Sequence, residues 1–596
     1  MAPPNLVSLF EDQNDPSPPP HAYYPGYSSF PLSPSHPYSG SAYASYPSEI
    51  PRNVRRASSA SSSLPASFLS SEWIDHPIST EDRVERTLNN ARFDDRVSRE
   101  PVEQPSFEKK NESKGSKINK EQHIVAVEEV VDLETDYEVD LLPEEHPQNL
   151  PLWRKWLAIV IVSCCSFCVT GSSSMAPFTE TAVADDFHIS HEIAVLSVSL
   201  FVEGMALGPL LTGPLSEMYG RNITYRASFT LMFAFSFGVA FAPNTAVYLI
   251  FRFLSGLVGA TFLSVAGGTV SDLFTNEEVA NPMAFYTCSP FIGPIFGPLV
   301  SGFINQNLYW RWTYYILTIW IFVQTVFLYI CIPETYVPIL RKWKAARLRK
   351  STGDESYYWA PLDKQDKNVA KAMLISFYKP FELIFYERMA LLLNLWTSLV
   401  LGILYLTFQA FPIIFTEKHD FTIQQSGLTF LGIGVGMVCA MPTQSYFNKL
   451  VVRDAKKNGG IAPPESRLYM GEIGAVLVPI SLFWLSFTTY ASVPWIVPII
   501  ASIPFGIGLY YVFTAVFTYL VTAYRPLAAS AMAGNTAMRC TFAAVFSLFA
   551  GYMYEGMGTV GATALLAGIM TVMAPLPFIF RRIGPRLREK SRFAAH

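Results

Sequence analysis

The nine residues Gly213-Pro-Leu-Ser-Glu-Met-Tyr-Gly-Arg221 separate two long apolar stretches. Gly213 and Gly220 allow a tight turn, because glycine adopts backbone conformations that a Cβ atom excludes. Glu217 and Arg221 add charges that can pair with neighbouring helix ends in one conformation and separate in another. We interpret the stretch as a charged hinge between two helices at a membrane surface. The alternative is an ordinary turn anchored by charge.

Apolar runs dominate the chain on both sides of this hinge. Half of the 596 residues are hydrophobic and 15% are charged. From Trp156 onward, runs of about 20 apolar residues recur, the length that crosses a hydrocarbon core as a helix. The net charge of −4 says little, because acids in the tail offset basic residues in the membrane loops, and no nucleic-acid partner is implied. We predict twelve spans, at 156–178, 190–213, 222–243, 245–270, 283–304, 313–333, 389–415, 424–446, 468–489, 493–521, 527–553 and 559–580.

One long loop divides the predicted spans into two sets of six. We therefore expect an all-α membrane protein of two six-helix bundles, 151–333 and 389–582, joined by a cytoplasmic linker, 334–388. Such a pair of bundles encloses a path that opens to either side by rocking. An amphipathic stretch within 334–358 is expected to lie along the inner membrane surface.

The first 150 residues have a different composition from the rest. Pro, Ser and Tyr are abundant up to about residue 65, so we expect a disordered cytoplasmic tail without a cleavable signal peptide. Arg55-Arg56-Ala-Ser58-Ser59 suits a basophilic kinase, although such serines also arise by chance. Residues 121–145 alternate acids with Val and Leu and are expected to be coil rather than a docking segment.

Lys and Arg predict the orientation, because they gather in cytoplasmic loops. The opposite side offers little beyond Arg311 and Lys418. Both termini, including the tail 583–596, are therefore expected in the cytoplasm. The basic clusters lie in the linker, before span nine and after span twelve: Arg341, Lys342, Lys344, Arg347, Arg349, Lys350, Lys449, Arg453, Lys456, Lys457, Arg467, Arg581, Arg582, Arg586, Arg588 and Lys590.

Two ionisable side chains lie deep within predicted spans. Arg252 lies in span four, about 10 Å below the membrane surface. A charge at that depth costs about 2.5 kcal/mol or more unless it is paired or hydrated. Glu203 lies near the middle of span two. We expect the two to pair and Glu203 to carry a proton or attract a cationic substrate; the alternatives are a helix-stapling arginine and an inter-helix hydrogen bond.

Span five has a repeated Gly-Pro pattern. Glycines four apart let another helix approach closely, and each proline removes a ladder hydrogen bond. The alternative is a purely structural kink. The pattern consists of Gly293, Pro294, Gly297, Pro298 and Gly302.

The second set of spans supplies candidates for a substrate cavity. Arg539 is a second buried cation, with Asn535 one turn before it, and either contacts substrate or ties helices together. Tyr405, Phe408 and Tyr510 belong to an aromatic group that lines an adaptable cavity or packs against helices. The seven cysteines, all in apolar segments, are interpreted as packing residues, and no metal or cofactor is expected.

At the cytoplasmic edge, Asp272 follows span four and is counted with the hinge, and Glu334 is expected to pair with basic hinge residues in the outward-facing state. The hinge resembles the signature loop between the second and third helices of major facilitator transporters. The Arg252 stretch resembles that family's fourth-helix motif, whose arginine is implicated in proton transfer, and the Gly-Pro span resembles its antiporter signature, associated with export. With Pro333-Glu-Thr-Tyr336 and Pro464-Glu-Ser-Arg467, the chain from about residue 146 resembles the fungal twelve-spanner drug:proton antiporters.

The resemblance implies a proton-coupled exporter of small organic compounds in a fungal plasma membrane. Its substrates would be drugs, toxins, polyamines or secondary metabolites. Three alternatives stay open: a symporter or uniporter for nutrients or organic acids, a transceptor that signals through the tail, and an enzyme. An enzyme is disfavoured, because no nucleotide loop, metal cluster or nucleophile arrangement occurs.

Overall fold

The computed structural model describes residues 138–275, 278–353, 358–363, 369–460, 462–589 and 591–593. Most of the tail up to residue 150, including the kinase site at Ser58 and Ser59, lies outside the described residues. The described residues belong to one compact unit.

Within the described residues, the regular elements are helices, and the only β pairing is an isolated bridge between Glu138 and Trp359. The first set of helices is α3 (Leu152–Met175), α4 (Glu180–Phe187), α5 (His191–Tyr219), α6 (Arg221–Ala240), α7 (Thr245–Gly259), α8 (Thr261–Ser264), α9 (Ala266–Leu273), α10 (Ala280–Asn307) and α11 (Arg311–Cys331). The second set is α14 (Arg388–His419), α15 (Ile423–Leu428), α16 (Leu431–Ala440), α17 (Gln444–Lys457), α18 (Tyr469–Phe487), α19 (Ile496–Ala523), α20 (Ala528–Met573) and α21 (Leu576–Arg588).

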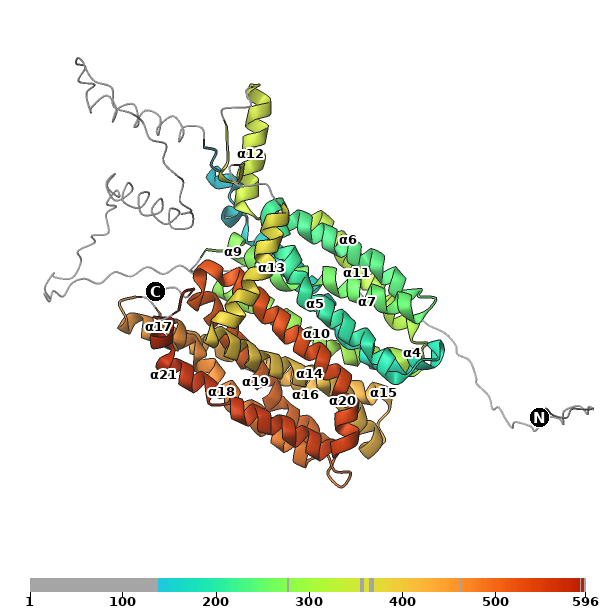
Figure 1. Cartoon of the computed structure of the whole chain (residues 1–596). Coiled ribbons are helices and arrows are strands. Elements are labelled where there is room, and N and C mark those ends of the chain that lie inside the picture. Colours follow the sequence, from blue (N-terminus) through green and yellow to red (C-terminus); the bar gives the residue numbers. More distant parts are fainter. Residues whose placement is uncertain are drawn as a thin grey trace, which may run out of the picture. The chain divides into compact units, whose positions relative to one another are not determined.

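Eleven helical segments of the described chain are long and apolar enough to cross a membrane. The last of them, Ala528–Arg588, is 61 residues long and turns back at Gly558, where φ is 71° and the helical conformation is broken. Figure 1 shows this reversal within α20. This one segment therefore contains both predicted span eleven and predicted span twelve, with the break at Gly558 between them.

The helices pack as two groups with a seam between them (Figure 1). In the first group, α3 packs against α10, and α7 packs against α5 and α6. In the second, α14 packs against α20, and α19 packs against α16 and α18. Across the seam, α5 lies along α20, and α10 contacts α15 and α16. Hereafter, the hinge end is the end of the bundle at Gly220, and the far end is the opposite one, at His188 and Asp420.

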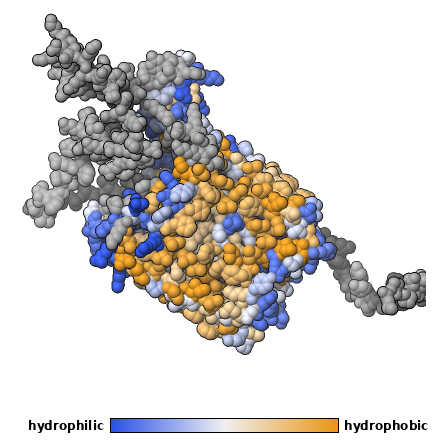
Figure 2. Space-filling view, in the orientation of Figure 1, coloured by the Kyte–Doolittle hydropathy of each residue, from blue (hydrophilic) through white to orange (hydrophobic). Residues whose placement is uncertain are grey.

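The outer surface of the helices is apolar. Ile330 and Val572 are more than 70% exposed, and many other large apolar side chains face outward with them. Figure 2 shows a broad hydrophobic surface over the bundle with hydrophilic residues toward its two ends. Lipid covers such a belt in a membrane protein, since an exposed apolar area of this extent is not stable in water.

The linker is more ordered than the sequence indicates. It contains the helices α12 (Val337–Thr352) and α13 (Val369–Tyr386), and α13 packs against α5 and α20. Residues 138–145 are not free coil, as predicted for the acidic segment, but dock on α12. Arg341 Nη2 lies 2.8 Å from Asp140 Oδ1, and Lys344 Nζ lies 2.8 Å from Glu145 Oε2. Opposite charges therefore hold the end of the tail against the linker.

Candidate functional site

The hinge turn is shorter than the sequence predicts. α5 continues through Gly213 and Pro214 to Tyr219, so the prediction of a turn at Gly213 is wrong. Only Gly220 turns the chain, with φ at 99°, before α6 begins at Arg221. A Cβ atom at Gly220 would collide with the carboxylate of Glu334. The turn requires glycine for its conformation and for this close approach.

Glu334 binds the backbone of the hinge rather than a basic side chain. It is only 9% exposed. Arg221 N–H donates to Glu334 Oε1 at 2.9 Å, and Asn222 N–H donates to Oε2 at 3.1 Å. Thr335 and Tyr336 N–H also donate to Oε1, each at 3.0 Å. A carboxylate thus caps the N-terminus of α6, where unpaired N–H groups and the helix dipole favour negative charge.

The side chain of Arg221 joins α6 to α9. Its Nε lies 3.2 Å from Asp272 Oδ2, its Nη1 donates to Ser216 Oγ at 2.7 Å, and its guanidinium lies 4.7 Å from the centre of the Tyr336 ring. Glu217, the other predicted hinge charge, is exposed and makes no ion pair among the described residues. The basic hinge residue Arg221 therefore pairs with Asp272, whereas the ion pair predicted between Glu334 and a basic hinge side chain is not formed.

Arg252 is buried inside the first helix group, with 1% of its surface exposed. The Asn244 side chain caps α7 by accepting from Val247 N–H, and Arg252 lies about two turns further along. Its guanidinium donates to the carbonyls of Ser197 and Ser172, at 3.2 and 3.3 Å, and lies 4.4 Å from the centre of the Phe201 ring. The predicted ion pair with Glu203 is absent: Arg252 binds carbonyls and an aromatic face instead.

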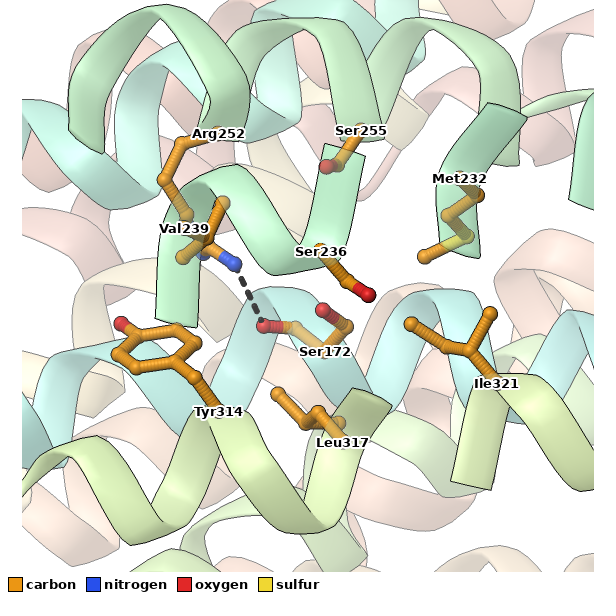
Figure 3. A pocket seen from close by; sticks show the side chains of 9 residues that line it. All are labelled: Ser172, Met232, Ser236, Val239, Arg252, Ser255, Tyr314, Leu317 and Ile321. Carbon is orange, nitrogen blue, oxygen red and sulfur yellow. Dashed lines mark hydrogen bonds between the residues drawn. The ribbon is translucent and has the colours of Figure 1, made fainter. Parts of the chain in front are cut away.

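A small cavity adjoins this guanidinium (Figure 3). Its volume is about 10 Å³, room for about one water molecule. Arg252 Nη2 and Ser255 Oγ are buried next to it without a hydrogen-bond partner in the described structure. The other lining residues come from α3, α6 and α11: Ser172, Met232, Ser236, Val239, Tyr314, Leu317 and Ile321. Two unsatisfied polar atoms beside such a space are typical of a buried water site.

Glu203 lies on the seam between the two helix groups. Thr541 Oγ1 of α20 donates to Glu203 Oε1 at 3.3 Å, and the side chain is partly buried. Nearby, Ser199 Oγ donates to the carbonyl of Ala544 at 2.9 Å. The carboxylate therefore faces the opposite helix group rather than Arg252, because α5 turns positions 199 and 203 toward α20 while Ser197 faces α7.

The Gly-Pro span packs as its glycines predict. Pro290, Pro294 and Pro298 lie inside α10. A Cβ atom at Gly293 would collide with Thr170 Oγ1, and one at Gly297 with Ser174 Oγ, so both glycines allow α10 to touch α3. Gly302 faces the other helix group, where a Cβ atom would lie 3.0 Å from the carbonyl of Ile423. This span thus contacts both groups.

The predicted cavity residues of the second group are scattered among several contacts. Asn535 Nδ2 donates to Asn394 Oδ1 at 2.9 Å and to Thr397 Oγ1 at 2.8 Å, tying α20 to α14. Arg539 lies over the Phe517 ring, 5.2 Å from its centre, and donates to Thr536 Oγ1 at 3.5 Å.

Tyr405 and Phe408 lie against each other on α14, with ring centres 5.2 Å apart. The Tyr405 hydroxyl shares a hydrogen bond of 2.7 Å with Ser173 of α3, across the seam. Tyr510 instead hydrogen-bonds to Gln444 within the second group. The structure therefore brings Tyr405 and Phe408 to the seam, and Tyr510, besides its bond to a neighbouring helix, lies in a buried cluster with Cys288 of α10.

Sequence reasoning missed one buried acid at the far end. Glu180 begins α4 and is 2% exposed, and Gln409 Nε2 of α14 donates to its Oε2 at 2.6 Å. Its position just beyond predicted span one made it resemble an ordinary loop acid. Its burial depends on α14, which is more than 200 residues away in the sequence.

Two groups of membrane-length helices, buried cations and charged seam residues define a multi-pass membrane transporter. The comparisons agree: residues 162–547 match the family model of the Major Facilitator Superfamily, and the chain belongs to this family.

Several curated relatives are similar over most of the chain. The chain is 44% identical to Efflux pump atB of Aspergillus terreus, over 71% of this chain and 93% of that protein. It is 40% identical to the Probable drug/proton antiporter YHK8 of Saccharomyces cerevisiae, over 76% and 88%. It is 38% identical to the multidrug transporter mdrA of Aspergillus fumigatus, over 78% and 76%.

Among solved structures, the chain resembles the xylose transporter XylE from E. coli in a partially occluded inward-open conformation. The TM-score is 0.52 and the identity 15%, over 72% of this chain and 98% of that one. At this identity, the likeness concerns the fold.

Proposed function

We propose that this chain is a proton-coupled efflux transporter that exports small organic compounds such as drugs, toxins, polyamines or secondary metabolites. The observation that carries the proposal is its 34–44% identity, over about 70% or more of its length, to proteins named as efflux pumps and as a probable drug/proton antiporter. The buried ionisable side chains at the seam and beside the small cavity support ion coupling, because charges are retained in a membrane interior only where they serve a pathway or a partner.

The two helix groups, 151–333 and 389–582, act as rocking units in this proposal, and 334–388 links them. The Arg221–Asp272 pair and the Glu334 cap connect the hinge end of α6 to α9 and to the chain after α11. Because these contacts lie within the first group, α6 must shift against α9 and the chain after α11 as the groups rock if the hinge is to have two discrete arrangements. Gly293 and Gly297 keep α10 close to α3 within the first group, and Pro294 and Pro298 lie in the same stretch of α10.

Glu203 and Arg252 are the proposed proton-coupling residues. Because they do not pair with each other, each acts through its own surroundings: Glu203 across the seam to Thr541, and Arg252 through carbonyls and the adjoining cavity. Proton and substrate must favour different states, since a ligand with equal affinity for both shifts nothing.

Substrate passes along the seam in this proposal. Tyr405, Phe408 and Arg539 supply an aromatic and cationic surface there, while Asn535 and Tyr510 hold the surrounding helices. The aromatic faces suit substrates of varied shape, because they offer large contact areas with few directional bonds.

The protein is proposed to lie in the plasma membrane with both termini in the cytoplasm. The Lys and Arg clusters at the hinge end support this orientation. A kinase acting on the N-terminal tail is part of the same proposal, through Ser58 or Ser59.

Expression in a yeast strain stripped of its exporters tests the function. Efflux and resistance are compared for fungicides, polyamines and organic acids, with and without a proton uncoupler. We expect uncoupler-sensitive efflux of at least one class and loss of pH dependence in Glu203→Gln. Efflux that is unchanged by the uncoupler would exclude proton antiport as the mechanism. Signalling lost on deletion of the tail, with flux intact, would favour a transceptor.

A further inference from the structure

A buried carboxylate closes the far end of the seam. Glu180 stands at the N-terminus of α4, near the end of the first membrane-length segment Leu152–Phe187, and its partner Gln409 belongs to α14 in the other helix group. Phe178 and Phe430 form a second contact between the two groups, with ring centres 6.2 Å apart. We call Glu180, Gln409, Phe178 and Phe430 the far-end gate. Ile423 N–H, which donates to Gln306 Oε1 at 3.1 Å, adds a further contact across the seam at this end.

Glu180 has few partners for a group so deeply buried. Its Oε2 accepts only the neutral amide of Gln409, and its Oε1 has no hydrogen-bond partner in the described structure. An ionised carboxylate in this setting is strongly disfavoured, because burial removes water without supplying a cation. A protonated carboxyl group at the same position costs much less to bury.

The charged groups around Glu180 do not change this conclusion. α5 presents His191, whose Nε2 lies 3.9 Å from Glu180 Oε2, but this side chain is 54% exposed and is charged only when protonated. α10 carries no Asp, Glu, His, Lys or Arg, and α14 presents an amide. On α4 itself, Asp185 and Asp186 are exposed, and Asp186 pairs with Arg311 at 3.3 Å.

From this geometry we propose that Glu180 is a proton-binding residue of the transport cycle, and that its protonation from outside the cell closes the far-end gate. The inference rests on the proposed proton antiport. With the gate open, water hydrates the carboxylate. A proton from the external solution binds to one of its oxygens, the neutral group enters the seam against Gln409, and the gate shuts. Once the hinge end has opened, the proton leaves Glu180 for the cytoplasmic solution, and when the gate reopens with substrate the ionised carboxylate returns to water.

A proton-dependent gate at Glu180 meets a requirement of antiport that Glu203 alone does not meet. An antiporter must avoid closing empty toward the outside, since that would uncouple the two fluxes. A gate that closes readily only when it carries a proton meets this condition directly. The role belongs to the far end, where external protons arrive, whereas Glu203 lies at mid-depth beside Thr541.

The test measures the distance across the far-end gate and needs no known substrate. Spin labels are placed on the exposed residues Thr181 of α4 and Lys418 of α14, after replacement of the accessible cysteines Cys164, Cys331 and Cys439. The full chain is reconstituted in nanodiscs, and the distance distribution is recorded as the pH is lowered. One bound proton changes the ratio of closed to open molecules by at most about tenfold per pH unit. We expect a pH-dependent rise of the closed population in the wild type.

Three variants decide the outcome. Glu180→Gln, which resembles the protonated group, should stay closed at every pH, and Glu180→Asp should keep the pH dependence. Glu192→Gln is the matched control, because Glu192 also bridges the seam at this end, accepting from the Tyr552 hydroxyl at 3.2 Å, but is exposed; it should behave as the wild type. The inference would be overturned if the closed population of Glu180→Gln depended on pH, or if that of the wild type did not.

Uncoupler-sensitive efflux of ethidium, measured in cells for the same variants, separates this inference from the proposed function. Wild-type efflux that is insensitive to the uncoupler contradicts proton antiport itself. Coupled wild-type efflux with an unchanged Glu180→Gln gate contradicts only the role of Glu180.

Discussion

The carboxylate of Glu334 accepts the backbone N–H of Arg221 at 2.9 Å, so the chain leaving α11 caps the first turn of α6. Three further N–H groups point at the same carboxylate. One acidic side chain therefore fixes both the turn at Gly220 and the exit of the sixth span. A cap of this kind couples two spans that the sequence separates by a hundred residues.

Replacing Glu334 by Gln should weaken this cap. The amide NH2 would face backbone donors, and hydrogen bonds to a charged acceptor contribute about 1.5–3 kcal/mol each. We expect a loss of about 2 kcal/mol or more, seen as a lower Tm of the purified protein in detergent. Glu217→Gln, at an exposed hinge position, is the control and should leave the Tm unchanged.

Efflux should depend on the ion pair between Arg221 and Asp272 at the hinge. Asp272→Asn and Arg221→Gln are each expected to slow efflux, and the double variant should be no slower than the worse single one. Residues in direct contact typically show coupling of about 0.5–3 kcal/mol. Additive effects on the efflux rates would contradict a shared hinge contact.

Gly293→Ala should separate α10 from α3. The new methyl group would collide with Thr170 Oγ1, and overpacking of this kind costs about 1–3 kcal/mol. Gly551→Ala is the matched control, because its Cβ atom would meet nothing within 4 Å. We expect the first variant to lower thermal stability and the second to maintain or raise it; equal behaviour would contradict the close packing.

Asn535→Ala should destabilise the protein without altering which compounds it exports. It removes two hydrogen bonds to α14, each contributing about 0.6 kcal/mol on average within membranes. Arg539→Gln, at the aromatic seam, should instead change the resistance profile. Comparison of Tm and of resistance to a drug panel checks both. A changed profile in Asn535→Ala would place this residue in contact with substrate.

The acidic end of the tail should be released from α12 by charge reversal. Arg341→Asp breaks the pair with Asp140, and a second change, Asp140→Arg, should restore it. Limited proteolysis near residue 140 reports the release. Full protection of the single variant would show that the ion pair does not hold this segment.

Acid should release the same segment. The Lys344 ammonium lowers the pKa of Glu145, so this pair stabilises docking above the ordinary pKa of the carboxyl group and is lost as the pH falls through the lowered value. Salt should release the segment at neutral pH, since the pair is exposed and therefore screened. Cleavage that is independent of both salt and acid would contradict this origin.

The sequence by itself determined the membrane class, the positions of the spans and the hinge motif. These follow from local quantities: the length of apolar runs, the spacing of glycines, and charges inside otherwise apolar segments. The close packing at Gly293 and Gly297 was predictable for the same reason, because glycines four residues apart lie on one helix face.

Only the tertiary structure decided the partners of the buried charges. Arg252 and Glu203 were expected to pair, yet Arg252 of α7 binds carbonyls of its own helix group, and the rotation of α5 turns Glu203 toward α20. Glu180 was not distinguished from a loop acid until α14 covered it. Burial and pairing of a charge depend on helices that are distant in sequence, and the rotation of each helix about its axis is set by packing that no local pattern encodes.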